Sequence, residues 1–550
     1  MKKDFLIVGQ GLAGSILAWE LMQHEQRVLV IDNDRVNSAS RVAAGLINPI
    51  TGQRLVKANE VDVCLPVALD CYQKLEQQFS QQFYFPLPML RLFRCQAEQD
   101  RYQHRCRDAA YQVYLGQHFQ PGATGEPIKD EHGGFEQHHT GYVDFANLLA
   151  ALREYMQQQQ AYQCASFDCQ DLQFHDQSIQ WRNYQADCVV FCEGAGALDN
   201  PWFRWLPFQL CKGDIITVES HKPVPTKLIN DGHWLLPISS QRVKVGATYE
   251  WQWRDDQPGD VAGQILSRAY QQLTGDTQFS LVDHQSGLRP TTKDKHPFLG
   301  RHAERKQLAI FNGFGSKGAL TIPYYAARLV ETLLHNKPLP ADADISRFVH
   351  GSSMVTLAKC FLSNHINTGD VVIDATVGNG HDTEFLARCV GVEGRVYGFD
   401  IQQQAILNTQ ERLAGCGLAN RVTLYCAGHE SMSDFIEAGL RGKIAAIVFN
   451  LGYLPGNDKY IHTQTASTLK ALQQALSLLK VGGIVSIVTY SGHAEGQREA
   501  CEIRNWLQQL SDHGIKFEFV SANKDALNAP GLIKIIKQRE IDEFDDNQAC

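Results

Sequence analysis

The chain has 550 residues, of which 44% are hydrophobic and 20% charged, and its formal net charge is −9. This length and balance are typical of a globular protein with two or more domains, each able to bury a core of its own. No run of about 20 apolar residues occurs, which excludes a membrane-spanning helix. The acidic balance excludes a surface that is basic throughout, although a local basic groove is sufficient to contact RNA phosphates.

The 15 cysteines are scattered, without a Cys-x-x-Cys pair and without histidines at zinc-binding spacing. We therefore expect reduced thiols and no metal site. The apolar run that follows Met1, Lys2 and Lys3 is short and enters a glycine turn instead of a signal-peptide cleavage site. These features predict a cytoplasmic protein.

The first predicted strand, residues 5–8, runs into Gly9-Gln10-Gly11-Leu12-Ala13-Gly14, and a helical pattern follows through residue 21. A second strand, residues 28–31, ends at Asp32. This is the dinucleotide fingerprint, with an acid about 20 residues on that can bind a ribose. The position of this fingerprint near the N-terminus favours FAD as the cofactor. The six residues from Gly9 to Gly14 taken alone would also fit NAD. The candidate cofactor-binding residues of this segment are Gly9, Gly11, Gly14 and Asp32.

Residues 38–49 are rich in small side chains, which let a backbone pass close to a flat ring, although a mobile loop would have the same composition. The segment resembles the one that lies along the flavin in amine-oxidising flavoenzymes of the D-amino-acid oxidase and glycine oxidase type. The resemblance implies an antiparallel substrate sheet, for which residues 243–249 are a candidate strand. It also implies flavin contacts from Ala43, Ala44 and Gly45.

Residues 312–319, Asn-Gly-Phe-Gly-Ser-Lys-Gly-Ala, open a helix that is predicted to run through residue 334. The N-terminus of this helix can face the electron-rich end of a reduced flavin. The resemblance gives Arg289 the role of holding a substrate carboxylate, because guanidinium matches a carboxylate bidentately. A surface or interdomain ion pair is the alternative. Lys317 is a second candidate, for an anionic substrate or the cofactor. Further cofactor candidates are Gly313, Gly315, Ser316 and Gly318.

Two prolines within residues 336–342 oppose continuation of that helix. We place the domain boundary after these prolines, between about residues 350 and 353. Residues 1–350 would form the oxidoreductase, residues 351–538 a second domain, and residues 539–550 a solvated acidic tail.

The second domain opens with an apolar strand, residues 371–373, followed by a glycine turn, residues 374–383, and helical spacing over residues 384–390. A further strand, residues 395–399, ends in Asp400. This order predicts a pocket for an adenosine-like ligand, although a tight turn in an ordinary α/β domain would look similar. Strands and helices alternate along this half, which predicts a largely parallel sheet.

The turn at residues 374–383, the segment Phe-Asn-Leu-Gly-Tyr-Leu-Pro at residues 449–455 and the segment at residues 490–496 together resemble the MnmM family of tRNA methyltransferases. The resemblance covers residues 352–537. It implies S-adenosyl-L-methionine as the methyl donor and tRNA as the partner. The candidate cofactor-binding residues are Asp374, Gly378, Asn379, Gly380, His381, Asp382, Thr383, Asp400, Gln402 and His429.

Asn450 follows a predicted strand, residues 445–449, at the edge where open α/β sheets bind ligands. Its amide oxygen can accept a hydrogen bond from an amine and aim the lone pair of that amine at the methyl carbon; a simple strand cap is the alternative. Tyr453 is a candidate for stacking on the target base or bordering the methyl group. The base that removes the amine proton stays open between His493, Glu495, His429 and Glu430.

The sequence therefore predicts an α/β protein with two cofactor domains. The first is an FAD-binding Rossmann-type domain with an antiparallel substrate sheet, and the second is a Rossmann-like methyltransferase domain. The pairing resembles the MnmC type of bifunctional enzymes of tRNA wobble uridine 34, with the halves in reverse order. The resemblance implies oxidative removal of the carboxymethyl group from 5-carboxymethylaminomethyl-2-thiouridine and methylation of the resulting amine. Two alternatives remain: an amino-acid oxidase fused to an unrelated RNA methyltransferase, and a noncatalytic RNA-binding factor.

Overall fold

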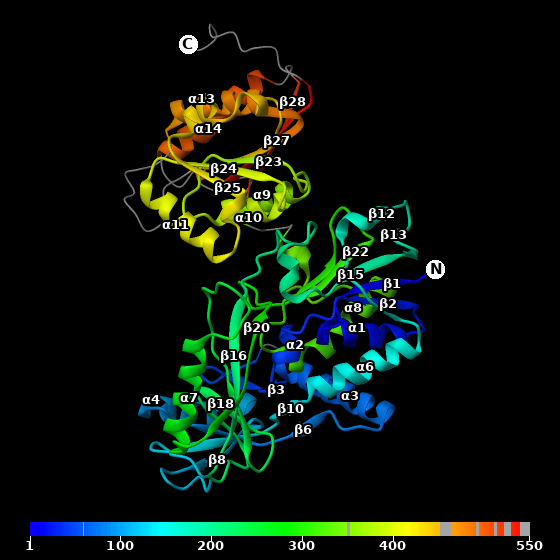
Figure 1. Cartoon of the computed structure of the whole chain (residues 1–550), viewed down its shortest axis with the longest axis vertical. Coiled ribbons are helices and arrows are strands. Elements are labelled where there is room, and N and C mark those ends of the chain that lie inside the picture. The colour runs from blue at the N-terminus through cyan, green and yellow to red at the C-terminus, as the bar shows by residue number, and fades with distance from the viewer. Residues whose placement is uncertain are drawn as a thin grey trace. The chain divides into compact units, whose positions relative to one another are not determined.

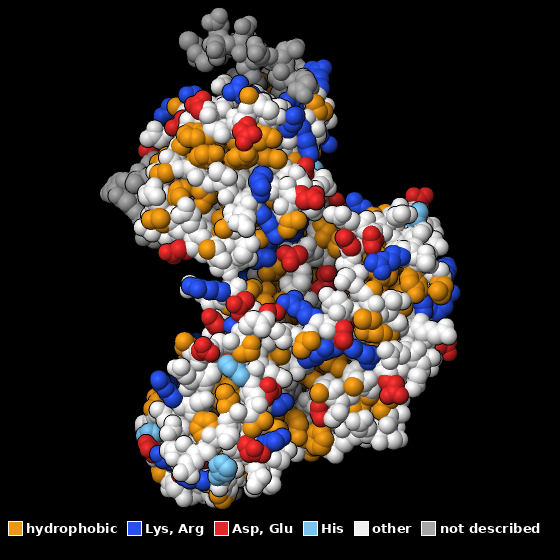
Figure 2. Space-filling view, in the orientation of Figure 1, with side chains coloured by type: hydrophobic (Ala, Val, Ile, Leu, Met, Phe, Trp, Pro, Cys, Tyr) orange, Lys and Arg blue, Asp and Glu red, His pale blue; other side chains and the backbone are white. Residues whose placement is uncertain are grey.

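A computed structural model describes residues 1–58, 60–348, 353–451, 464–490, 494–510, 514–521 and 530–539. It divides into two compact units (Figure 1). The first consists of Met1–Ala197 and Phe208–Ile345, and the second of Leu198–Pro207 and Ser346–Cys550. Basic and acidic side chains are interspersed on the face of each unit that Figure 2 shows. None of the helices in the described ranges is long and apolar enough to cross a membrane.

The first unit contains a six-stranded sheet whose strand order is β11-β2-β1-β15-β22-β21. All neighbours are parallel except β21 and β22. The central strands are buried along their whole length, because helices such as α1 and α8 cover the sheet (Figure 1). The elements of this layer are β1 (Phe5–Val8), α1 (Leu12–Gln23), β2 (Val28–Asp32), α3 (Val61–Phe79), α6 (Phe145–Gln158), β11 (Tyr162–Cys164), β15 (Cys188–Phe191), β21 (Phe298–Arg301), β22 (Leu308–Asn312) and α8 (Gly318–His335).

A second, eight-stranded sheet of the same unit has the order β20-β16-β19-β18-β17-β7-β9-β8 and is antiparallel except between β17 and β7. The predicted strand at residues 243–249 is shorter than expected: β19 ends at Gly246, and Ala247 to Tyr249 lie outside it, although the Thr248 amide still donates to the Asp214 carbonyl oxygen of β16. The strands, with the covering helix, are β7 (Met89–Leu92), β8 (Leu115–Phe119), β9 (Gly134–Gln137), β16 (Cys211–Glu219), β17 (Leu228–Asp231), β18 (His233–Pro237), β19 (Arg242–Gly246), α7 (Asp260–Thr274) and β20 (Ser280–Arg289).

Shorter elements complete the first unit. They include the segment that was predicted to lie along the flavin, which forms α2 and β3. Their bounds are α2 (Ala39–Val42), β3 (Leu46–Ile47), β4 (Ile50–Thr51), β5 (Val56–Lys57), β6 (Tyr84–Pro86), α4 (Gln96–Cys106), α5 (Ala109–Gln112), β10 (Gly141–Val143), β12 (Leu172–Phe174), β13 (Ile179–Trp181) and β14 (Tyr184–Ala186).

The second unit is built on a seven-stranded sheet with the order β25-β24-β23-β26-β27-β29-β28, in which the first five strands are parallel. Helices α13 and α14 cover one face, and α10 and α11 the other (Figure 1). The elements are α9 (Met354–Ser363), β23 (Val371–Asp374), α10 (His381–Val390), β24 (Arg395–Asp400), α11 (Gln403–Gly415), β25 (Val422–Cys426), α12 (Met432–Phe435), β26 (Ile444–Leu451), α13 (Thr465–Leu478), β27 (Leu479–Thr489), α14 (Ala494–Gln509), β28 (Ile515–Ser521) and β29 (Gly531–Lys537).

The chain order of this sheet reverses at β23, whose neighbours are β24 on one side and β26 on the other. Loops that leave the carboxyl ends of strands on the two sides of such a point diverge, and the space between them is where open α/β sheets bind ligands. The predicted glycine turn and Asn450 belong to β23 and β26. The topology therefore places both at one ligand-binding edge.

Candidate active sites

The turn between β1 and α1 brings three backbone segments together. A side chain on Gly9, whose φ is +101°, would place its Cβ 2.6 Å from the carbonyl oxygen of Cys192. A Cβ on Gly14 would lie 2.0 Å from the Gly9 carbonyl oxygen. Both contacts are to backbone, which cannot rotate away. Glycine is therefore required at both positions for α1 to begin directly behind β1.

Asp32 closes this turn from the end of β2. Its Oδ1 accepts a hydrogen bond from the Gln10 amide at 2.9 Å, and its Oδ2 accepts one from the Asp34 amide at 2.9 Å. The guanidinium of Arg153, which the sequence did not single out, lies 3.8 Å from Oδ2. The carboxylate is thus held at the position that a ribose-binding acid occupies in dinucleotide folds.

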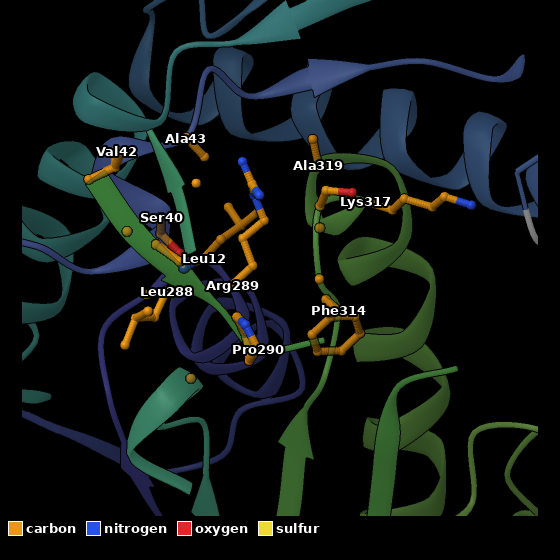
Figure 3. A pocket seen from close by; sticks show the side chains of 18 of the residues that line it. Leu12, Ser40, Val42, Ala43, Leu288, Arg289, Pro290, Phe314, Lys317 and Ala319 are labelled. Carbon is orange, nitrogen blue, oxygen red and sulfur yellow. Dashed lines mark hydrogen bonds between the residues drawn. The ribbon is translucent and has the colours of Figure 1, made fainter. Parts of the chain in front are cut away.

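A cavity of about 830 Å³ extends from this turn to the eight-stranded sheet. It fits a dinucleotide cofactor, because the first turn, the small residues after Asn37 and the loop before α8 all line it (Figure 3). Gly14 and Gly313 do not line it and act through packing, since a Cβ on Gly313 would lie 2.8 Å from the Thr292 methyl group. The predicted residues in its wall are Gly9, Gly11, Asp32, Ala43, Ala44, Gly45, Arg289, Gly315, Ser316, Lys317 and Gly318.

The small-residue segment after β2 is attached to the dinucleotide turn by Ser40. Its Oγ accepts a hydrogen bond from the Leu12 amide at 3.0 Å, and the two residues lie side by side in Figure 3. Further along, Gly45 has a φ of +67°, and a Cβ there would lie 2.0 Å from the Val143 carbonyl oxygen. Ser40 was not predicted, because a serine within a small-residue stretch gives no sign of its partner.

Arg289 ends β20 and points into the cavity, between Ala43 and Ala319 (Figure 3). Its Nη1 donates a hydrogen bond to the Thr248 carbonyl oxygen at 3.0 Å, and its guanidinium lies 4.5 Å from the ring centroid of Tyr249. Gly213 makes room for it, because a Cβ there would lie 1.9 Å from Nη2. A guanidinium held on one side by a carbonyl and a ring retains N–H groups for a carboxylate.

Lys317 is the residue before α8, and its side chain points away from Arg289 in Figure 3. Burial and the neighbouring charge of Lys295 lower the pKa of Lys317. The two predicted cations therefore do not converge on one point. Arg289 has the better geometry for a small carboxylate.

The second glycine turn lies between β23 and α10. Gly378 has a φ of +53° and donates its amide to Asp400 Oδ2 at 2.9 Å, while Asp400 Oδ1 accepts from the Gln402 amide at 2.9 Å. A Cβ on Gly380 would lie 2.6 Å from Thr409 Oγ1. The turn, the acid at the end of β24 and helix α11 thus form one assembly with the layout of a nucleoside pocket.

Asp374 is fully buried at the end of β23 and binds within the turn. Its Oδ2 accepts a hydrogen bond from Thr383 Oγ1 at 2.6 Å, and its Oδ1 accepts one from the Thr376 amide at 3.2 Å. Burial, with the charge of Asp382 nearby, raises the pKa of Asp374 to about 7. Asp374 and Thr383 bind each other, and their contact with a cofactor remains a prediction.

Helix α11 holds the outer part of this turn through residues that the sequence did not single out. Arg412 Nε donates to the Asn379 carbonyl oxygen at 2.9 Å, and Asn408 Nδ2 donates to Asn379 Oδ1 at 3.0 Å. Arg412 Nη2 lies 3.3 Å from His381 Nε2, and burial lowers the pKa of His381. The polar groups of the turn are therefore fixed before any ligand binds.

Asn450 lies within β26, one residue before its end, and was predicted to follow the strand. Its amide nitrogen donates to Asp382 Oδ2 at 3.0 Å, and its backbone amide donates to Thr376 Oγ1 at 2.7 Å. Asn450 Oδ1 and His429 Nε2 are buried without a hydrogen-bond partner in the part of the chain that the structure describes. Unpaired buried polar atoms are costly, so this edge fits a polar ligand.

Two predicted catalytic residues, Tyr453 and His493, lie outside the described residues. Glu495 is described and lies in the first turn of α14. The identity of the proton acceptor therefore remains a prediction.

Fold and sites together define the class of the protein: a flavin-type oxidoreductase unit joined to a methyltransferase unit. The FAD dependent oxidoreductase family model matches residues 4–332, and the chain belongs to that family. The rRNA methylase family model matches residues 396–536. The resulting architecture is MnmC-like, as the sequence predicted.

The oxidoreductase half is similar to glycine oxidase from Geobacillus kaustophilus, with 25% identity over 373 residues that cover 62% of this chain and 94% of that protein. It shares its fold with iminodiacetate oxidase from Chelativorans sp. BNC1, with a TM-score of 0.53 and 20% identity, over 62% of this chain and 97% of that one.

The methyltransferase half is similar to the chloroplastic tRNA (mnm(5)s(2)U34)-methyltransferase of Arabidopsis thaliana, with 42% identity over 142 residues. The match covers 24% of this chain and 51% of that protein, so this chain spans about half the length of that relative.

Proposed function

We propose that the protein modifies wobble uridine 34 of tRNA in two consecutive reactions. The first unit oxidises the carboxymethylaminomethyl group to an aminomethyl group, and the second unit methylates the amine. The supporting observation is that one chain joins an FAD dependent oxidoreductase to a domain that is 42% identical to a tRNA (mnm(5)s(2)U34)-methyltransferase. The product of the first reaction is an amine, which is the nucleophile that the second requires.

In the first reaction the substrate is an N-substituted glycine, and the carbon–nitrogen bond of its carboxymethyl arm is oxidised to an imine. A bound FAD would supply this two-electron oxidation, with oxygen as the final acceptor, which becomes hydrogen peroxide. Water then cleaves the imine into the 5-aminomethyl nucleoside and glyoxylate, so carbon, nitrogen and electrons balance.

Arg289 is the group of this chain that would bind the carboxylate of the substrate. It projects into the cavity between Ala43 and Ala319 and is held there by Thr248 and Tyr249 (Figure 3). Recognition of a carboxylate at that point supports an amine with a carboxymethyl arm as the substrate class.

In the second reaction the amine would attack the methyl carbon of S-adenosylmethionine; the nitrogen–carbon bond forms as the carbon–sulfur bond breaks, and S-adenosylhomocysteine leaves. The amide oxygen of Asn450 would accept a hydrogen bond from the amine, because it is buried and has no partner among the described residues. The amine reacts only in its neutral form, and the proton released on methylation passes to a base or to solvent. Asp400 and the turn at Gly378 would hold the nucleoside part of the methyl donor.

The two units act on one nitrogen, so their fusion raises the effective concentration of the second site near the product of the first. This advantage does not require transfer of the tRNA without release. The raised effective concentration is a reason for an oxidase and a methyltransferase to occur in one chain.

The test is mass spectrometry of nucleosides from tRNA that carries 5-carboxymethylaminomethyl-2-thiouridine, incubated with the flavin-loaded protein in air, with and without S-adenosylmethionine. We expect loss of the carboxymethyl group in both samples, and the 5-methylaminomethyl nucleoside only in the sample with S-adenosylmethionine. Parallel incubations with glycine and sarcosine measure hydrogen peroxide. Peroxide from the free amino acids together with unchanged tRNA would replace this proposal with an amino-acid oxidase.

A further inference from the structure

We propose that Asp382 and Lys359 form a positioning pair that fixes the amide group of Asn450, with its oxygen turned toward the substrate amine. The inference rests on the proposed methylation and gives Asp382, which the sequence suggested as a cofactor ligand, a different role. Lys359 belongs to α9 and has had no role so far.

The carboxylate of Asp382 connects the two residues. One oxygen, Oδ2, accepts a hydrogen bond from Asn450 Nδ2 at 3.0 Å, and the other, Oδ1, lies 3.2 Å from Lys359 Nζ. The side chains of Lys359 and Asp382 are only 24% and 17% exposed, so solvent screens the pair less than it would a surface ion pair. Lys359 Nζ also lies 5.3 Å from the ring centroid of Phe385. The pair therefore has a fixed position on α9 and α10.

An asparagine amide has a donor end and an acceptor end of nearly the same shape, so its orientation depends on its partners. An ionised carboxylate only accepts hydrogen bonds and can therefore bind only the nitrogen end of the Asn450 amide. Lys359 Nζ contacts the other carboxylate oxygen of Asp382 and holds the carboxylate in place, with Oδ2 left for the Asn450 amide.

With its nitrogen bound to Asp382, Asn450 presents its oxygen to the ligand edge of the sheet. That oxygen is buried without a partner in the described part of the chain, and the backbone at this position is fixed by the 2.7 Å hydrogen bond to Thr376 Oγ1. An amine can supply the missing N–H. Its lone pair would then point away from the amide oxygen and stay free to attack the methyl carbon. The reversed amide would present N–H groups to the amine and compete for the lone pair that attacks the methyl group.

The test is a double-mutant cycle between positions 382 and 450, measured as single-turnover methylation of tRNA that carries 5-aminomethyl-2-thiouridine. Asp382→Asn has the same shape as the natural residue but can donate, so it no longer selects the amide orientation. We expect the rate constant at saturating tRNA to fall by about 10- to 100-fold, with the KM for tRNA and the affinity for S-adenosylhomocysteine changed by less than about twofold. Lys359→Met should lower the same rate constant by a smaller factor, because the carboxylate remains.

The discriminating measurement is Asp382→Asn in an Asn450→Ala background. A residue that acts through the Asn450 amide has no further effect once that amide is gone. We therefore expect the rate constants of Asn450→Ala and of the double variant Asn450→Ala/Asp382→Asn to agree within about twofold. The matched control is Asp370→Asn, which breaks another aspartate–lysine pair of the second unit, Asp370 with Lys480 at 2.7 Å. That variant should leave the rate constant unchanged.

Three outcomes would overturn the inference. If wild-type protein transfers no methyl group to this tRNA, the proposed function fails and the inference with it. If wild-type protein is active but Asp382→Asn retains its rate constant, or lowers it equally in the Asn450→Ala background, the proposed function stands and the positioning role is wrong. If Asp382→Asn instead weakens S-adenosylhomocysteine binding by more than about tenfold, Asp382 is a cofactor ligand.

Discussion

Replacement of Arg289 by methionine tests whether the oxidase pocket recognises a carboxylate. The substitution keeps most of the length of the side chain but removes the guanidinium, whose position is fixed by Thr248 and by the ring of Tyr249 at 4.5 Å. Arg289→Lys keeps the charge but loses the planar pair of donors that matches a carboxylate. The two variants therefore separate charge from geometry.

The expected magnitude follows from the hydrogen bonds that the guanidinium can still make. A hydrogen bond to a charged group contributes about 1.5 to 3 kcal/mol. Two such bonds, discounted because Arg289 is only partly buried, give about 3 kcal/mol, or a fall of about 100-fold in kcat/KM for Arg289→Met. Arg289→Lys should lose less, about 10-fold, since one bond and the charge remain.

The assay is the rate of flavin reduction without oxygen, followed by absorbance after mixing with tRNA that carries the carboxymethylaminomethyl group. The matched control is Arg305→Met, because Arg305 also lies over an aromatic ring, 4.4 Å from the Phe174 centroid, but does not line the cavity. Flavin content per protein must equal that of the wild type. A kcat/KM for Arg289→Met within twofold of wild type would refute the assignment and show that another group binds the carboxylate.

Three further predictions concern the cofactor sites and stability. Gly14→Ala should yield protein without flavin, because the new Cβ would lie 2.0 Å from the Gly9 carbonyl oxygen. Flavin content is measured as visible absorbance per protein. The control Gly259→Ala should keep its flavin, because the nearest atom to its new Cβ is 3.8 Å away. Asp400→Ala should weaken S-adenosylhomocysteine binding by about 10- to 100-fold in calorimetry and leave flavin reduction unchanged; equal affinity would contradict its role in the turn. Burial raises the pKa of Asp374 to about 7, so the folded state binds the proton more tightly than the unfolded state. The free energy of unfolding of the second unit should therefore fall as pH rises from about 4 to 7 and level off above. Asp374→Asn should remove that fall in urea titrations, and an unchanged pH dependence would show that Asp374 is not its source.

The sequence alone determined both cofactor folds. Gly9, Gly14 and Gly380 could be read in advance because each marks a place where backbone or a neighbouring side chain leaves no room for a Cβ. The spacing from these turns to Asp32 and Asp400 is equally local, since one strand–helix–strand unit fixes it. Such features depend only on residues within one supersecondary motif, so they can be predicted from the spacing of residues in the sequence.

The partners of the site residues were decided by tertiary structure alone. Ser40, Arg153 and Lys359 gave no signal in the sequence, because each reaches its partner from another element: the partners are Leu12, Asp32 and Asp382. Such polar side chains acquire a specific role only when packing brings a particular hydrogen-bond or charge partner within about 3 to 4 Å. The sequence thus specifies where the cofactors would bind, and the fold specifies which side chains orient the reacting groups.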